Sequence, residues 1–184
     1  MEFKFLIICP QNRDLSKIIQ TIQDKNDNFV CCKRFVNNIE YKDKESIDEL
    51  YYLDNNQITT AIKNNSILFV VSNNEKVSGI TIDDFYNSNI IPMYISEFNS
   101  ISTNLLNMYK DNILLVWLDT KHHIDSNILK QDICEVKYLE EKISTYNYKY
   151  VYLLDENVET ISDIINSYYY GDDNKKQEIL SEYC

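Results

Sequence analysis

Glycine, proline and arginine are scarce in this 184-residue chain. It contains two glycines and two prolines, far below the usual shares of roughly 7% and 5%. A glycine-rich phosphate loop needs several residues that tolerate positive φ close to a bound phosphate, so the glycine count almost excludes one. Arginine occurs only as Arg13 and Arg34. Because arginine binds phosphate and carboxylate groups through two donors at once, a site built from several arginines is also excluded.

Long apolar runs are missing too. The N-terminal run FKFLIIC ends at Pro10 and is too short for a signal peptide or for a membrane span of about 20 residues. The five cysteines are odd in number and two are adjacent, which argues against a secreted disulfide framework. We therefore expect a cytoplasmic, intracellular protein. For the adjacent pair we expect one buried structural thiol, Cys31 or Cys32, and one thiol at the surface.

Positive charge is in deficit. Lys and Arg together number 18 against 29 Asp and Glu, which gives a formal charge of −11. This balance argues against general nucleic-acid binding and against an anionic membrane surface. An acidic decoy that blocks a nucleic-acid-binding protein is a weak alternative, because the acids are interspersed with lysines and form no ordered stripe.

Hydrophobic residues make up 44% of the chain, enough for a core. Continuous apolar runs predict buried parallel strands at residues 3–9, 112–118 and 150–154, with weaker strands at 29–32, 67–71 and 92–96. Helical patterns lie between them, at residues 15–22, 55–63, 82–86, 101–109, 132–144 and 158–168. This alternation predicts an α/β fold, a mostly parallel sheet flanked by helices. We expect one domain over residues 1–170, with a core (1–32 and 80–170), a small insertion (33–79) and a solvated or loosely docked acidic tail (171–184).

Two segments resemble the guanylate kinase family. Residues 51–79, YYLDNNQITTAIKNNSILFVVSNNEKVSG, align without a gap with that family's acceptor-site segment. Residues 146–169, YNYKYVYLLDENVETISDIINSYY, resemble its late strand and following helix. With the first strand, the resemblance covers residues 3–169. It implies a P-loop kinase-like fold with an inserted subdomain that resembles an acceptor site.

The resemblance also implies a phosphate loop, which is degenerate here. The matching stretch is CPQNRDLS, residues 9–16, in which only Pro10 and Ser16 agree with the family pattern. All three glycines are gone, Leu15 stands in place of the phosphate lysine, and Lys17 comes one position late. The residues of this degenerate loop that could still meet a ligand are Pro10, Asn12, Arg13, Ser16 and Lys17.

The acceptor site implied by the resemblance is altered as well. Tyr51 matches a tyrosine that contacts the acceptor phosphate, but Phe69 stands where a glutamate reads guanine and Ser78 replaces the tyrosine before Gly79. Arg34 is offset from the family's arginine pair, and Glu97 takes the place of a Mg²⁺-linked aspartate. The candidate binding groove consists of Arg34, Tyr51, Phe69, Ser78, Gly79 and Glu97. We expect no catalytic residue, no metal and no cofactor.

Inactive relatives of the family serve as interaction modules, so the resemblance implies a pseudoenzyme whose partner is another protein and for which nucleotide is not expected as a ligand. The alternative is a divergent nucleotide- or small-molecule-binding kinase with relocated ligands, namely Lys17, Lys33, Arg34, Lys42 and Glu97. Fifteen tyrosines fit an interface protein, since tyrosine is enriched in protein contacts; the alternative is the codon bias of an AT-rich genome, to which we attribute more than half of the excess. His122 and His123 lack the spacing of a zinc site and are expected in an exposed loop.

Overall fold

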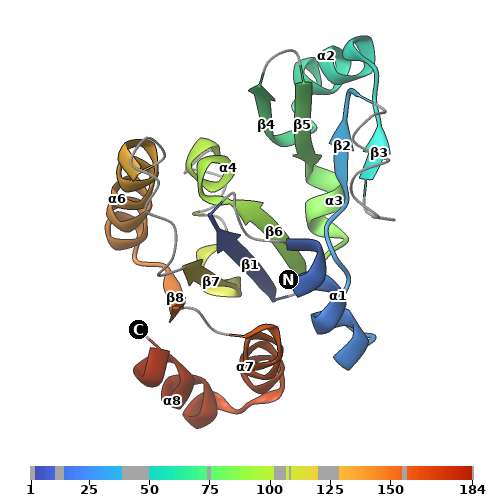
Figure 1. Cartoon of the computed structure of the whole chain (residues 1–184). Helices are drawn as coiled ribbons and strands as arrows, with labels where there is room; N and C mark the ends of the chain where they lie inside the picture. Colours follow the sequence, from blue (N-terminus) through green and yellow to red (C-terminus); the bar gives the residue numbers. More distant parts are fainter. Residues whose placement is uncertain are drawn as a thin grey trace.

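The fold, obtained as a computed structural model, contains a parallel sheet at its centre (Figure 1). The structure describes residues 3–10, 15–38, 50–73, 76–101, 107, 109–119, 129–154 and 157–183. The strands of the parallel sheet are β6 (Ile90–Tyr94), β1 (Lys4–Cys9), β7 (Ile113–Asp119) and β8 (Lys149–Leu154), in that spatial order. All three pairings are parallel. Every residue of β1 is buried, as expected for a strand with a helical layer on each face.

Helices cover both faces of the parallel sheet (Figure 1). On one face lie α1 (Leu15–Lys25), α7 (Val158–Tyr170) and α8 (Asp173–Tyr183), whose isoleucines join one buried cluster. On the other face lie α4 (Ile95–Ser100) and α6 (Leu129–Tyr146), which contribute to a second cluster. The strand β7 alternates between them, with Val116 in the first cluster and Trp117 in the second. The period of two residues along a strand therefore builds two cores from one apolar run.

A second, smaller sheet lies beside the first (Figure 1). Its strands are β3 (Leu50–Tyr52), β2 (Arg34–Val36), β5 (Lys76–Thr81) and β4 (Ile67–Asn73), in that spatial order. The pair of β2 and β3 is parallel, and β5 runs antiparallel to both β2 and β4.

Two helices accompany this second sheet. The helix α2 (Asn55–Lys63) begins at Asp54, whose carboxylate accepts hydrogen bonds from the backbone N–H groups of Asn56 and Gln57. The short helix α3 (Ile82–Tyr86) directly follows β5, with Thr81 as its N-cap. Side-chain oxygens before the first turn thus fix where both helices start.

These observations confirm the expected α/β fold class, with a parallel four-stranded sheet flanked by helices. The strands expected at 3–9, 112–118, 150–154 and 67–71 are present within one or two residues. The helices at 55–63 and 82–86 have the expected bounds, and those at 15–22, 132–144 and 158–168 are each longer by up to three residues at an end.

The strand expected at residues 29–32 is wrong. Only Cys31 forms a bridge, with Ile90 of the neighbouring strand β6. The reason is Asn89, whose side-chain oxygen accepts from the Val30 N–H at 2.7 Å and whose amide donates to the Asn28 carbonyl at 3.0 Å. An asparagine side chain therefore takes the place of a backbone partner. Both Cys31 and Cys32 are buried, so the expectation of one surface thiol is also wrong.

The strand expected at residues 92–96 spans Ile90–Tyr94 instead. It ends because Glu97 turns back and accepts a hydrogen bond from the Tyr94 N–H at 2.8 Å, which starts α4. The other end of α4 is capped by the buried Lys142, whose Nζ donates to the carbonyls of Phe98 at 2.8 Å and Ile101 at 3.1 Å. Most of the helix expected at 101–109 lies outside the described residues.

The C-terminal segment is not a loosely docked end. Residues Asp173–Tyr183 form α8, which packs against α7 and β8. Ile179 is 4% exposed and belongs to the first core cluster. A narrow apolar face suffices to dock an otherwise polar helix. This face contains too few apolar residues to stand out in the sequence. Among the described residues, no helix combines the length and the apolar character needed to cross a membrane.

Candidate functional site

The six residues of the candidate binding groove come from five elements. Arg34 lies on β2, Tyr51 on β3, Phe69 on β4, and Ser78 and Gly79 on β5. The sixth residue, Glu97, lies on α4 beside the parallel sheet. The structure therefore gathers five of these positions on the second sheet.

Arg34 and Glu97 form an ion pair between the two halves of the fold. The Nη2 of Arg34 donates to Oε1 of Glu97, while Oε2 of the same carboxylate accepts from the Tyr94 N–H. Both side chains are largely buried, with 16% and 7% of their surfaces exposed. The guanidinium carbon also lies 5.9 Å from the ring centre of Phe69, within cation–π range. The only arginine in the described part of the chain is thus engaged within the protein.

Tyr51 belongs to a second polar cluster. Its hydroxyl donates to Oδ2 of Asp84 at 2.6 Å, and the Thr81 hydroxyl donates to the same oxygen at 2.5 Å. Burial, and then the hydrogen bond to Asp84, raise the pKa of Tyr51 well above its ordinary value. The phenol therefore stays a neutral donor whose hydrogen already has an acceptor.

Gly79 marks the tightest packing of the region. It pairs with Val70 on one side and with Phe35 on the other. A Cβ at this position would lie 2.4 Å from the Phe69 carbonyl oxygen and 2.6 Å from Cζ of Phe35. Because Phe35 and Phe69 are both buried, side chains of the protein itself fill the space around Gly79.

The sequence reading missed Asp84 and Thr81. The pattern T-I-D-D at the start of α3 was the available signal, since a threonine followed three residues later by an acid is typical of a helix start. Burial is the main cause that raises the pKa of the Cys32 thiol to about 12, while the hydrogen bond with Ser88 lowers this pKa and the nearby Asp84 raises it. A thiol of that pKa is almost fully protonated at neutral pH and does not act as a nucleophile.

The segment expected to be a degenerate phosphate loop is described only in part. Pro10 follows β1, and Ser16 and Lys17 lie in the first turn of α1, whereas Asn12 and Arg13 lie outside the described residues. The relocated ligand Lys42 and the pair His122 and His123 also lie outside them. Among the residues that are described, no group of three His, Cys, Asp or Glu side chains is placed to hold a metal ion.

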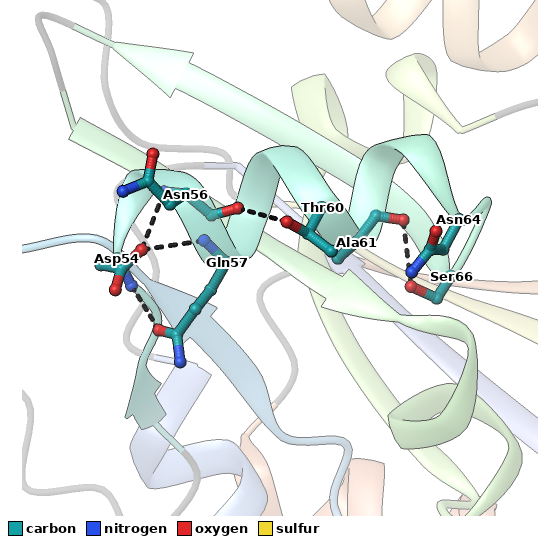
Figure 2. Close-up of a pocket in the computed structure, with 7 residues that line it drawn as sticks. All are labelled: Asp54, Asn56, Gln57, Thr60, Ala61, Asn64 and Ser66. Atoms are coloured by element: carbon teal, nitrogen blue, oxygen red, sulfur yellow. Dashed lines mark hydrogen bonds between the residues drawn. The ribbon is translucent and has the colours of Figure 1, made fainter.

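A shallow pocket of about 420 Å³ lies along α2. Figure 2 shows that its polar groups bond to one another: Asp54 caps the helix, the Thr60 hydroxyl donates to the Asn56 carbonyl, and the Ser66 hydroxyl donates to the Ala61 carbonyl. Local helix caps and turns therefore account for this polar surface, and we assign no ligand to it.

No known family model matches this sequence, and no curated protein matches it. Its fold does resemble solved structures. One is the crystal structure of guanylate kinase from Anaplasma phagocytophilum, with a TM-score of 0.56 and 12% sequence identity over 97% of this chain and 86% of that chain. At this identity the likeness concerns the fold alone. The chain has a guanylate kinase-like α/β fold.

Proposed function

We propose that this protein is a guanylate kinase-like pseudoenzyme that no longer transfers phosphate and instead binds another protein. The observation that carries the proposal is the ion pair of Arg34 and Glu97. Phosphoryl transfer depends on cationic donors aimed at the phosphate and on acids that hold Mg²⁺. In this chain the donor, Arg34, and the acid, Glu97, are bound to each other. Both side chains are largely buried, so separating the two charges is costly.

The remaining groups of the candidate binding groove support the same conclusion. The hydroxyl of Tyr51 already donates its hydrogen bond to Asp84. Phe69 offers an apolar ring at the position where guanine recognition needs a hydrogen-bond acceptor. A nucleotide would have to displace the contact of Arg34 with Glu97 and that of Tyr51 with Asp84 before these side chains could bind it. The sequence also lacks the glycines and the lysine of a phosphate loop at residues 9–16. These features together favour loss of the reaction over its relocation.

The proposed partner is a protein that contacts the second sheet. Its edge strand β3 carries the exposed Tyr52 next to Tyr51, and tyrosine gives rigid contact area with a polar tip. Recognition of a phosphorylated peptide usually needs a cluster of arginines, so we propose an unphosphorylated partner. The acidic charge of −11 favours a basic one.

The test begins with thermal unfolding in the presence of GMP, GDP, ATP or GTP, each with and without Mg²⁺. A ligand that binds only the folded state stabilises it by about 2.7 kcal/mol at a hundred times its dissociation constant. The pseudoenzyme should show no shift at millimolar nucleotide and no phosphate transfer from ATP to GMP. A clear shift would favour the alternative, a nucleotide binder with ligands such as Lys17 and Arg34.

The interaction role needs its own test. Purified protein should capture a partner reproducibly, and Tyr52→Ala should reduce the affinity by about tenfold if this tyrosine lies at the centre of the contact. The matched control is Tyr138→Ala, since Tyr138 on α6 is also about half exposed but lies away from the second sheet. Equal effects of the two variants would contradict the proposed surface.

A further inference from the structure

A cavity of about 450 Å³ lies between α6 and the strands β7 and β8, on the face of the parallel sheet that α4 and α6 cover (Figure 1). Its lining residues are Trp117, Glu140, Ile143, Ser144, Asn147, Tyr148 and Tyr150. The volume falls within the range of small-molecule sites.

The chain builds this cavity from one helix face and two strands. Glu140, Ile143, Ser144 and Asn147 follow the i, i+3, i+4 and i+7 spacing that places residues on one side of a helix. Asn147 then adopts a left-handed conformation with φ of 53°, which asparagine tolerates better than most residues. The chain reverses there, so Tyr148 and Tyr150 come back against the sheet. The floor is buried, and Glu140, Ser144 and Asn147 are exposed at the mouth.

Two polar atoms of the buried lining side chains lack partners. Neither Nε1 of Trp117 nor the hydroxyl of Tyr148 has a hydrogen-bond partner among the described residues, and these side chains are only 6% and 5% exposed. Leaving a buried polar group unpaired costs about 1–3 kcal/mol. Burial raises the pKa of Tyr148 to about 12, so its phenol remains a donor at neutral pH. Both polar atoms are enclosed by the protein, so what this wall offers to a ligand is the rings of Trp117 and Tyr148.

The charge of the lining selects the ligand class. Among the described lining residues, Glu140 is the only charged one, and no lysine or arginine joins it. This arrangement disfavours phosphates and carboxylates. Three aromatic rings, those of Trp117, Tyr148 and Tyr150, favour a planar or cationic group through their π faces.

We infer that the cavity between α6, β7 and β8 binds a small aromatic amine, with its ring against Trp117 and Tyr148 and its ammonium group toward Glu140. This site shares no residue with the candidate binding groove. It is therefore independent of the proposed loss of phosphate transfer, and the nucleotide experiment does not affect it.

Trp117 is the only tryptophan in the chain, so tryptophan fluorescence reports on this cavity alone. The probe is 2-phenylethylamine, titrated into the full-length protein, with 2-phenylethanol as a neutral analogue and 3-phenylpropionate as an anionic one. We expect a saturable change with the amine at a dissociation constant of about 1 mM, a weak fragment affinity. The alcohol should bind several-fold more weakly, and the carboxylate should give no saturable change.

Matched variants locate the site. Glu140→Gln should weaken amine binding about fivefold, the size of a partly exposed charge contact. Glu141→Gln removes the same charge from the next exposed position of α6 and should leave the affinity unchanged. Ser144→Phe, at an exposed helix position, should fill the mouth and weaken binding more than tenfold while the circular dichroism spectrum is retained.

Three results would overturn the inference. One is a fluorescence signal that does not saturate with the amine up to about 20 mM, roughly twenty times the expected dissociation constant. Another is equal binding of the amine and the carboxylate. The third is an equal effect of Glu140→Gln and Glu141→Gln, which would reduce the interaction to the general acidity of the protein.

Discussion

Arg34 on the second sheet and Glu97 on α4 neutralise each other across the boundary between the two sheets. The carboxylate also fixes the first turn of α4 through the Tyr94 N–H. One glutamate therefore serves as a helix cap, as a counter-ion and as a link between the inserted segment and the parallel sheet. The contact joins an arginine and a glutamate, residue types that active sites often use, but its role in this fold is structural.

Glu97→Gln should lower the free energy of unfolding by about 3 kcal/mol, because it leaves the largely buried Arg34 charge without its counter-ion. The double variant Arg34→Met with Glu97→Gln should recover more than about 1 kcal/mol of that loss, since it removes the unpaired charge. Urea unfolding monitored by circular dichroism measures both. Glu182→Gln, at an exposed position of α8, is the control. A double variant no more stable than Glu97→Gln alone would contradict the buried pair.

Tyr51→Phe should destabilise the protein by about 1–2 kcal/mol, because it removes the hydroxyl that donates to Asp84. The neighbouring substitution Tyr52→Phe removes the same hydroxyl group from an exposed side chain of the same strand. It should alter the free energy of unfolding by less than about 0.5 kcal/mol. Thermal unfolding of the two variants side by side checks this. If both behave alike, the cluster of Tyr51, Asp84 and Thr81 contributes nothing to stability.

Lys142 should make the protein more stable as the pH rises from 7 to 9.5. Burial lowers the pKa of Lys142 from 10.5 to about 8, so in this range the unfolded chain holds a proton that the folded protein has released. Stability rises with pH wherever the unfolded state binds more protons. At 1.36 kcal/mol per pKa unit, this lysine contributes a gain of about 2 kcal/mol.

The measurement for Lys142 is urea unfolding at several pH values, with Lys142→Met compared against the parent protein. The variant should be less stable at every pH, since it leaves the carbonyls of Phe98 and Ile101 without their donor. Its stability should also lack the rise between pH 7 and 9.5. Parallel pH profiles for the two proteins would show that the lysine keeps an ordinary pKa.

Ile179→Ala should cost about 2–4 kcal/mol, because Ile179 anchors α8 in the first core cluster. Ile62→Ala makes the same truncation on α2, where Ile62 is 49% exposed, and should cost less than about 1 kcal/mol. Limited proteolysis adds a local readout, since a detached α8 would be cleaved before the rest of the chain. Equal stability of the two variants would mean that the C-terminal helix is not docked.

The sequence predicted the fold class because its signals are long and repetitive. The runs that became β1, β7 and β8 are apolar on both faces, which only a sheet covered on two sides requires. The errors fall where a single side chain decides the outcome. Asn89 replaces a backbone partner and ends a strand after one residue, and Glu97 starts a helix inside a stretch that looks extended. Such contacts depend on tertiary placement, which no local pattern records.

For the candidate binding groove, the sequence suggested residues but not the partners that these residues meet inside the protein. Alignment with a family indicated Arg34, Tyr51 and Glu97, yet nothing in the sequence showed that Arg34 would meet Glu97 or that Tyr51 would meet Asp84. These contacts join residues 63 and 33 positions apart. The cavity beside Trp117 was missed entirely, because its lining comes from a helix face and two strands whose residues look like ordinary core.

The position of β1 has a consequence for how the chain folds. Phe5 pairs with Ile90 and Lys4 with Ile113. Both partner strands of β1 therefore lie far along the chain and are synthesised much later than β1. Closing such long loops is slow, whereas neighbouring strands such as β4 and β5 meet early. We expect the second sheet to gain hydrogen-exchange protection during refolding before the parallel sheet does, although the parallel sheet contains most of the buried core.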